Sequence, residues 1–183
     1  MAAGGNQDQT AIEQFCQRHN QDPLKIANEY LDTMQIAYTT ENLPLFLRLY
    51  NDPFVAVDVV EDSNDLYTIE RIKDEVGQMF AGFTGIKCVF ADRQITFAGD
   101  MIMIRTMRSF TANEFPMIAK CDMVMVLRKS YTQREFWQFI ATDQMLLHEE
   151  YVPLPDQVTN NSLNKLAVPA VKAQQPQENH LLW

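Results

Sequence analysis

Apolar residues in the first half of the chain recur at the spacing of helices. The stretch after Asp22-Pro23, a typical helix start with an acceptor at the cap and proline in the first turn, shows this most clearly. One face of that helix would carry Ala27, Tyr30, Leu31, Met34, Ala37 and Tyr38. Shorter helices are expected over residues 9–18 and 43–50, and another begins at Thr68. The apolar stripe of this last helix comprises Ile69, Ile72, Val76, Met79, Phe80 and Phe83.

The second half of the chain changes to the alternation of strands. Four long strands are expected at residues 86–97, 101–110, 117–128 and 135–148. Turn-forming residues connect them, so they predict an antiparallel meander. One short strand, residues 54–60, lies among the helices and precedes a polar loop at 61–65. This order predicts an α+β fold in which the helices cover one face of a large curved sheet.

The composition divides the chain into three parts. Residues 1–21 form a polar tail and a short helix, 22–151 form the folded domain, and 152–183 form a Pro/Gln-rich tail. The closing Leu-Leu-Trp is an exception to this polar composition. Trp183 is either part of an unstructured end or a group that docks on a hydrophobic surface.

The chain is acidic, with a formal net charge of −9 and a pI of about 4.7. Its densest basic spot is Arg128-Lys129, so we expect no nucleic-acid surface and no binding to anionic membranes. The three widely spaced cysteines indicate no disulfide framework. We expect Cys88 and Cys121 to be free thiols in the core of a protein from a reducing compartment. Without a signal peptide or a long apolar run, a cytoplasmic protein is expected.

Three stretches carry a resemblance to a known family: TTENLPLFLRLYNDPFVAVD, GDMIMIRTMRSF and MVMVLRKSYTQREFWQF. Over roughly residues 24–149 the chain resembles the nuclear transport factor 2-like superfamily, which includes ketosteroid isomerases, scytalone dehydratases and polyketide-cyclase-like proteins. The resemblance implies a cystatin-like α+β roll, a cone-shaped curved antiparallel sheet wrapped around the N-terminal helices. It also implies an apolar pocket inside the cone and a homodimer through the outward sheet face.

Two aspartates are the candidate catalytic residues. In the stretch VAVDVVED, alternation places Asp58 on the same strand face as Phe54 and Ala56. The resemblance puts Asp58 at the position of the isomerase general base, and Asp122 approximately at that of a protonated acid that donates to an oxyanion. Asp122 shares the less apolar face of its strand with Lys120, which points it outward. Asp58 is either a pocket base or a carboxylate at the rim.

The resemblance places Met34 where isomerases have an oxyanion-binding tyrosine. Tyr30 and Tyr38 lie one turn to either side on the same helix face. The other candidate ligand-binding residues are Phe54, Phe80, Phe83, Arg105 and Trp137. Arg105 and Arg108 lie on opposite faces of one strand, and an interior Arg105 would pair with Asp58 or Asp143. Plain packing of helix on sheet accounts for the aromatic positions equally well.

Two functions follow, and the sequence leaves both open. The first is a pocket for a hydrophobic carbonyl compound, with or without acid/base catalysis that needs no cofactor and no metal; the histidines are not in metal-ligand spacing. The alternative is a non-catalytic homodimerisation or protein-interaction module with a methionine-rich sheet surface. A third possibility is that the tail inserts Trp183 into a neighbouring molecule.

Overall fold

The computed structural model describes residues 5–59, 63–131 and 137–154. Its four helices are α1 (Gly5–His19), α2 (Pro23–Thr39), α3 (Leu43–Leu47) and α4 (Ile69–Gly82). Its six strands are β1 (Tyr50–Asp58), β2 (Ser63–Tyr67), β3 (Lys87–Ala98), β4 (Met101–Ala112), β5 (Phe115–Tyr131) and β6 (Trp137–Pro153). Of the expected C-terminal tail, 152–183, the first two residues belong to β6, and the part from residue 155 onward, with Trp183, lies outside the described residues.

Three helices, α2, α3 and α4, begin where the sequence predicts, whereas α1 begins at Gly5 and not at the expected residue 9. The side chain of Asp22 caps α2 by accepting a hydrogen bond of 2.9 Å from the backbone nitrogen of Leu24. Thr68 caps α4 in the same way through the nitrogen of Arg71. The helix α3 is shorter than expected and ends at Leu47, because the chain enters β1 from residue 50.

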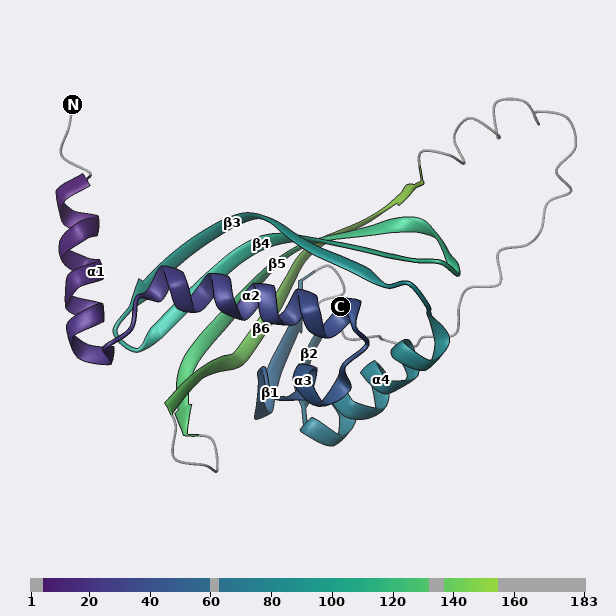
Figure 1. Cartoon of the computed structure of the whole chain (residues 1–183), viewed down its shortest axis with the longest axis horizontal. Coiled ribbons are helices and arrows are strands. Elements are labelled where there is room, and N and C mark those ends of the chain that lie inside the picture. The colour runs from purple at the N-terminus through teal and green to yellow at the C-terminus, as the bar shows by residue number, and fades with distance from the viewer. Residues whose placement is uncertain (1–4, 60–62, 132–136, 155–183) are drawn as a thin grey trace, which may run out of the picture.

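The strands form one curved, unclosed sheet in the order β2-β1-β6-β5-β4-β3. Neighbouring strands are antiparallel except β1 and β6, which are parallel. Figure 1 shows α2 lying along the curved sheet, α3 and α4 near β1 and β2, and α1 at the far end. The predicted α+β architecture is therefore confirmed, with its meander running from β3 to β6.

The prediction of a polar loop over residues 61–65 is wrong from Ser63 onward. Residues 63–67 form β2, which pairs with β1 from Asp58↔Ser63 to Phe54↔Tyr67. The physical reason is that β1 needs backbone partners on the side away from β6, and a hairpin supplies them even from polar residues.

Each long strand divides its side chains between two faces. The inner face packs against the helices and contains the core, including Ile104, Phe110, Cys121, Met125 and Leu146. The outer face carries the intervening residues, of which Val89, Met103 and Met145 are exposed apolar side chains. Cys88 and Cys121 are buried, free thiols, as expected.

Two β-bulges in β6 decide which of its residues face inward. The pairing with β5 shifts between Val126 and Leu127 and again between Asp122 and Met123. Each shift leaves one additional residue in β6, first Thr142 and then Leu147. The inward residues are Phe139 and Ala141, then Gln144 and Leu146, then Glu149 and Tyr151, opposite the core positions of β5.

None of the helices among the described residues combines the length and apolar character that a membrane span requires.

Candidate functional site

A buried arginine lies on the inner face of β4. Arg108 is 2% exposed, between the core residues Thr106 and Phe110 of the same face. A guanidinium cannot lose its charge at neutral pH, so this position places a permanent cation inside the core. Three residues earlier on the same strand, Arg105 points to the opposite, outer face.

Tyrosines and cysteines surround the Arg108 guanidinium. Tyr38 of α2 hydrogen-bonds to Arg108, and burial, partly offset by Arg108, raises the pKa of Tyr38 to about 12. Burial also raises the pKa of Cys88 to about 12, again against the opposing effect of Arg108. Burial by itself lowers the pKa of Arg108, but Tyr38, Cys121 and Cys88 act in the opposite direction and the net shift is upward. At neutral pH these hydroxyls and thiols are therefore protonated and uncharged.

Two further tyrosines have defined partners in this core. The Tyr30 hydroxyl donates to the carbonyl oxygen of Leu49 at 3.2 Å. The Tyr50 hydroxyl donates to Oε1 of Gln144 at 3.4 Å. Burial raises the pKa of both hydroxyls well above the ordinary value, so both remain hydrogen-bond donors.

Two carboxylates approach the same region from the ends of their strands. Asp58 is the last residue of β1, half-buried, and opposite the core residue Leu146. Glu149 of β6 faces inward opposite Cys121. The thiol of Cys121 has a pKa of about 11, raised by burial and, against the effect of Arg108, by Glu149, by the outward-facing Asp122 and by Asp58. Cys121 thus marks the place where both carboxylates and the guanidinium come within electrostatic range.

Aromatic rings at one end of the sheet become progressively exposed. The buried Phe110 contacts the half-buried Phe83 and Phe115, with ring centroids 6.1 and 6.5 Å apart. Phe115 in turn contacts the exposed ring of Tyr151 at 6.0 Å. These four rings form a continuous row of contacts from the buried core beside Arg108 to the surface.

The structure brings several predicted site residues together. Tyr30, Met34, Tyr38 and Phe54 are buried in one inner cluster, and Phe80 and Phe83 are half-buried against it. Asp58 lies on the inner face as its strand alternation indicates. Trp137 is the first residue of β6.

Arg105 and Asp122 do not share that interior. They pair with each other on the outer face, through Nη2 to Oδ2 at 2.7 Å and Nε to Oδ1 at 3.2 Å. The side chains are 52% and 19% exposed. The expectation that Arg105 pairs with Asp58 or Asp143 is wrong, because Arg105 and Asp122 occupy neighbouring outward positions on β4 and β5.

Sequence reasoning missed Arg108 and Glu149 as interior groups. Alternation separates Arg105 from Arg108, but it does not say which face the helices cover. For Glu149 the signal was absent, because the bulge at Leu147 reverses the alternation of β6. In the part of the chain that the structure describes, no group of three His, Cys, Asp or Glu side chains could hold a metal ion.

Comparisons with known proteins establish the fold. No protein-family model matches the sequence, and no curated protein matches it. Bd1075 from Bdellovibrio bacteriovorus aligns with 70% of this chain at 11% identity and a TM-score of 0.51, and the chain spans only 39% of that protein. A protein with a cystatin-like fold from Nostoc punctiforme PCC 73102 aligns at 13% identity and a TM-score of 0.54, over 73% of this chain and 94% of its own.

An NTF2-like protein from Cytophaga hutchinsonii ATCC 33406 gives the same TM-score, 0.54, at 8% identity, over 69% of this chain and 98% of its own. Identities this low carry information about the fold alone. Together with the curved sheet and the N-terminal helices, they show that the chain has the fold of the nuclear transport factor 2-like superfamily.

Proposed function

We propose that the inner face binds a hydrophobic small molecule through a carbonyl or carboxylate oxygen, with Arg108 as the anchor of that oxygen. The observation that carries this proposal is the 2% exposure of Arg108 in a core of aromatic and aliphatic side chains. Burying a cation costs several kcal/mol as an order of magnitude, so a buried guanidinium is an unusual group for a core of this kind. Guanidinium groups favour oxyanions, because they offer paired N–H donors together with a positive charge.

The neighbouring groups fit chemistry next to a carbonyl. In the proposed reaction Asp58 removes a proton from the carbon adjacent to the carbonyl, and the electron pair of that bond moves onto the oxygen. Arg108 and the hydroxyl of Tyr38 stabilise the resulting enolate oxygen. The protonated Asp58 then returns the proton to the carbon skeleton. The raised pKa of Tyr38, about 12, supports a role as donor and not as base.

Deuterium exchange tests binding and proton removal separately. Enolisable cyclic and aromatic ketones are incubated with the protein in D₂O, and the loss of α-proton signals is followed by NMR. We expect the wild type and Asp74→Asn, which changes an exposed aspartate of α4, to exchange at the same rate. Asp58→Asn should lower the rate by at least about a hundredfold, the usual contribution of a positioned base.

Arg108→Met is the matching test of the anchor, because methionine fills much of the same volume without the charge. Ligand-induced increases in melting temperature should disappear in Arg108→Met and persist in Asp58→Asn. Binding without exchange would restrict the function to ligand binding, with Asp58 as a rim carboxylate. The proposal fails if Arg108→Met and the wild type bind every ketone and carboxylate equally.

We propose as a second function that the outer sheet face pairs with a second copy of the chain. Val89, Met103 and Met145 are 51%, 38% and 38% exposed on that face. Apolar exposure on a strand surface favours association, and methionine adapts to a facing surface. The Arg105–Asp122 pair among these residues supplies both charges, so the surface can complement itself across a two-fold axis.

The molar mass in solution tests this second proposal by light scattering. Met103→Glu introduces a charge into the outer face, and Ile36→Glu introduces the same charge on an exposed position of α2. We expect a dimer for the wild type and for Ile36→Glu, and a monomer for Met103→Glu. A monomeric wild type at about 100 μM would contradict the pairing, since stable interfaces persist at such concentrations.

A further inference from the structure

One histidine lies on the outer face of the sheet, the face proposed to pair with a second copy of the chain. His148 of β6 is exposed and lies directly opposite Asp122 of β5. It points outward because Leu147 is the extra residue of the bulge in β6, after which the two strand faces are exchanged. Histidine is the side chain that ordinarily changes its charge between pH 5 and 8. The outer face therefore carries a charge that depends on pH.

Two ion pairs adjoin His148 on the side of β5. Asp122 accepts from Arg105 of β4, with Oδ2 2.7 Å from Nη2 and Oδ1 3.2 Å from Nε. Lys120 of β5 pairs with Glu150 of β6, with Nζ 3.2 Å from Oε1. The two pairs contribute equal numbers of positive and negative charges. While His148 is neutral, these five residues together therefore have no net charge.

The other side of His148, toward β1, is apolar. Val59 donates a hydrogen bond from its backbone nitrogen to β6, and its side chain is 53% exposed. Val57 pairs with Met145, the outward residue that precedes His148 on β6. Asp58 of β1 lies on the inner face, so in the described part of this strand no carboxylate points outward near His148. A neutral His148 therefore borders an apolar surface whose burial favours association.

Protonation of His148 adds one positive charge to this balanced surface. Arg105 chiefly, and His148 to a smaller degree, lower the pKa of Asp122, so the imidazole lies within electrostatic range of that carboxylate. In a single chain, water solvates the exposed imidazolium, and its charge costs little. Against a second copy the face loses its water, and two-fold symmetry brings two imidazolium groups into one interface. The loss of hydration and the repulsion between the two surplus charges both oppose association.

We propose that the outer face is a pH-dependent dimer interface, in which protonation of His148 separates the two copies. This inference rests on the second proposed function, the pairing of two copies through that face. At neutral pH the uncharged His148 is compatible with burial beside Val59 and Met145. As the pH falls through the range in which histidines titrate, the single chain binds more protons than the chain in the dimer. By linkage, acid then shifts the equilibrium toward the monomer.

Sedimentation equilibrium of the full chain measures the dimer dissociation constant at about pH 7.5 and about pH 5.5, on either side of the usual histidine titration. We expect the wild-type constant to be higher at the lower pH by about tenfold or more. His148→Gln stays uncharged, so its constant should match that of the wild type at the higher pH and change by less than about twofold on acidification. His148→Lys keeps a positive charge throughout and should be mainly monomeric at both pH values.

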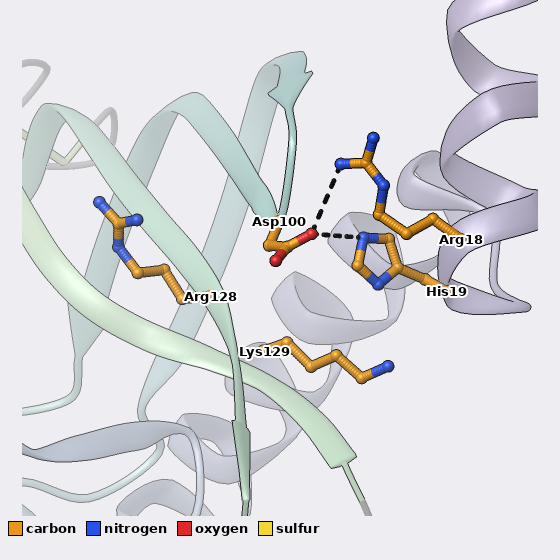
Figure 2. Close-up of a pocket in the computed structure, with 5 residues that line it drawn as sticks. All are labelled: Arg18, His19, Asp100, Arg128 and Lys129. Carbon is orange, nitrogen blue, oxygen red and sulfur yellow. Dashed lines mark ion pairs between the residues drawn. The ribbon is translucent and has the colours of Figure 1, made fainter.

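His19→Gln is the matched control, because His19 is the other histidine among the described residues. It lies on α1 with its side chain 4% exposed and Nε2 3.1 Å from Oδ1 of Asp100 (Figure 2). Its ring packs against the inward-facing Phe139, with centroids 5.6 Å apart, so it is not part of the outer face. This variant should therefore keep the pH dependence of the wild type. The third histidine, His180, lies outside the described residues, and His180→Gln serves as a second control.

The possible failures of this inference and of the pairing proposal can be told apart. A wild-type dimer with the same dissociation constant at both pH values would overturn the role of His148 and leave the pairing intact. A pH dependence that persists in His148→Gln would also overturn it, because another group would then carry the effect. A wild type that is monomeric at the higher pH would contradict the pairing and, with it, this inference. Circular dichroism at both pH values shows that the folded chains are compared.

Discussion

Two arginines three residues apart on β4 show how differently one strand can use the same side chain. Arg105 points outward, half-exposed, and forms a bidentate ion pair with Asp122. Arg108 points inward, 2% exposed, with a tyrosine hydroxyl as a hydrogen-bond partner. Water screens the first pair and already solvates both of its charges, so the pair contributes little to stability. Arg108 is buried away from water, so each contact that it makes with the protein contributes more to stability.

This contrast separates a structural ion pair from a functional candidate. The surface pair Arg105–Asp122 needs no functional explanation, because each residue is the partner of the other. A buried cation is costly to the fold, and proteins tend to retain such costs where they serve binding or catalysis. The following measurements test whether the two arginines differ as described.

The largest effect is expected for Arg108→Ala. Truncation leaves a void in the core and removes the hydrogen-bond partner of Tyr38, so the free energy of unfolding should fall by about 3 kcal/mol. Urea denaturation measures it. Arg105→Ala, studied in parallel, should shift the unfolding midpoint only slightly. Equal shifts for the two variants would show that Arg108 is no more important to the core than a surface residue.

Tyr38→Phe should have the next largest effect. It removes a hydrogen bond to a charged group and should lower the free energy of unfolding by about 2 kcal/mol. Tyr30→Phe is the matched control, since its hydroxyl donates to the neutral carbonyl of Leu49, and about 1 kcal/mol is expected. If Tyr30→Phe lowers the free energy of unfolding more than Tyr38→Phe does, the hydrogen bond to the charged Arg108 contributes no more to stability than one to a neutral carbonyl.

The smallest effect concerns the outer pair and appears as a pH dependence. The hydrogen bond from Arg105 holds the pKa of Asp122 below its ordinary value. A lowered pKa in the folded state stabilises the fold above the unfolded pKa, near 3.9, and the stabilisation is lost as the pH falls through the folded value. The stability difference between wild type and Asp122→Asn should therefore be constant from about pH 7 to 5 and shrink below about pH 4.

Urea midpoints measured at successive pH values give this profile. Arg105→Gln should reproduce it, because it removes the cause of the lowered pKa. A difference that stays constant down to pH 3 would mean that Arg105 does not perturb Asp122 in solution.

Local patterns were enough to predict most of the fold. The cap at Asp22 and the stripe through Tyr30 and Tyr38 determine α2, and alternation determines the four long strands. These signals depend on residues that are close together in the sequence, so they can be recognised in a single sequence. β2 was missed because its polar residues pair with β1 through the backbone, which composition does not record.

The site could be predicted only in part, for two physical reasons. Alternation placed Asp58 with Phe54, and both do face inward, but for Arg105 and Arg108 it could state only that they differ. The choice between them depends on where the helices pack, which is a property of the whole fold. Glu149 required knowledge of a bulge, which arises from the pairing of two strands and not from either strand alone.

The bulge at Leu147 has a consequence for changes in chain length. Cys121 pairs with Glu149 and Met123 with Leu146, so Leu147 is an extra residue that lies opposite no residue of β5. Deleting it would turn β6 into a regular strand here while every flanking side chain kept its face. A deletion at a regularly paired position nearer the strand end would instead exchange inward and outward residues. Leu147 is therefore a position at which evolution can shorten the protein without exchanging its inward and outward residues.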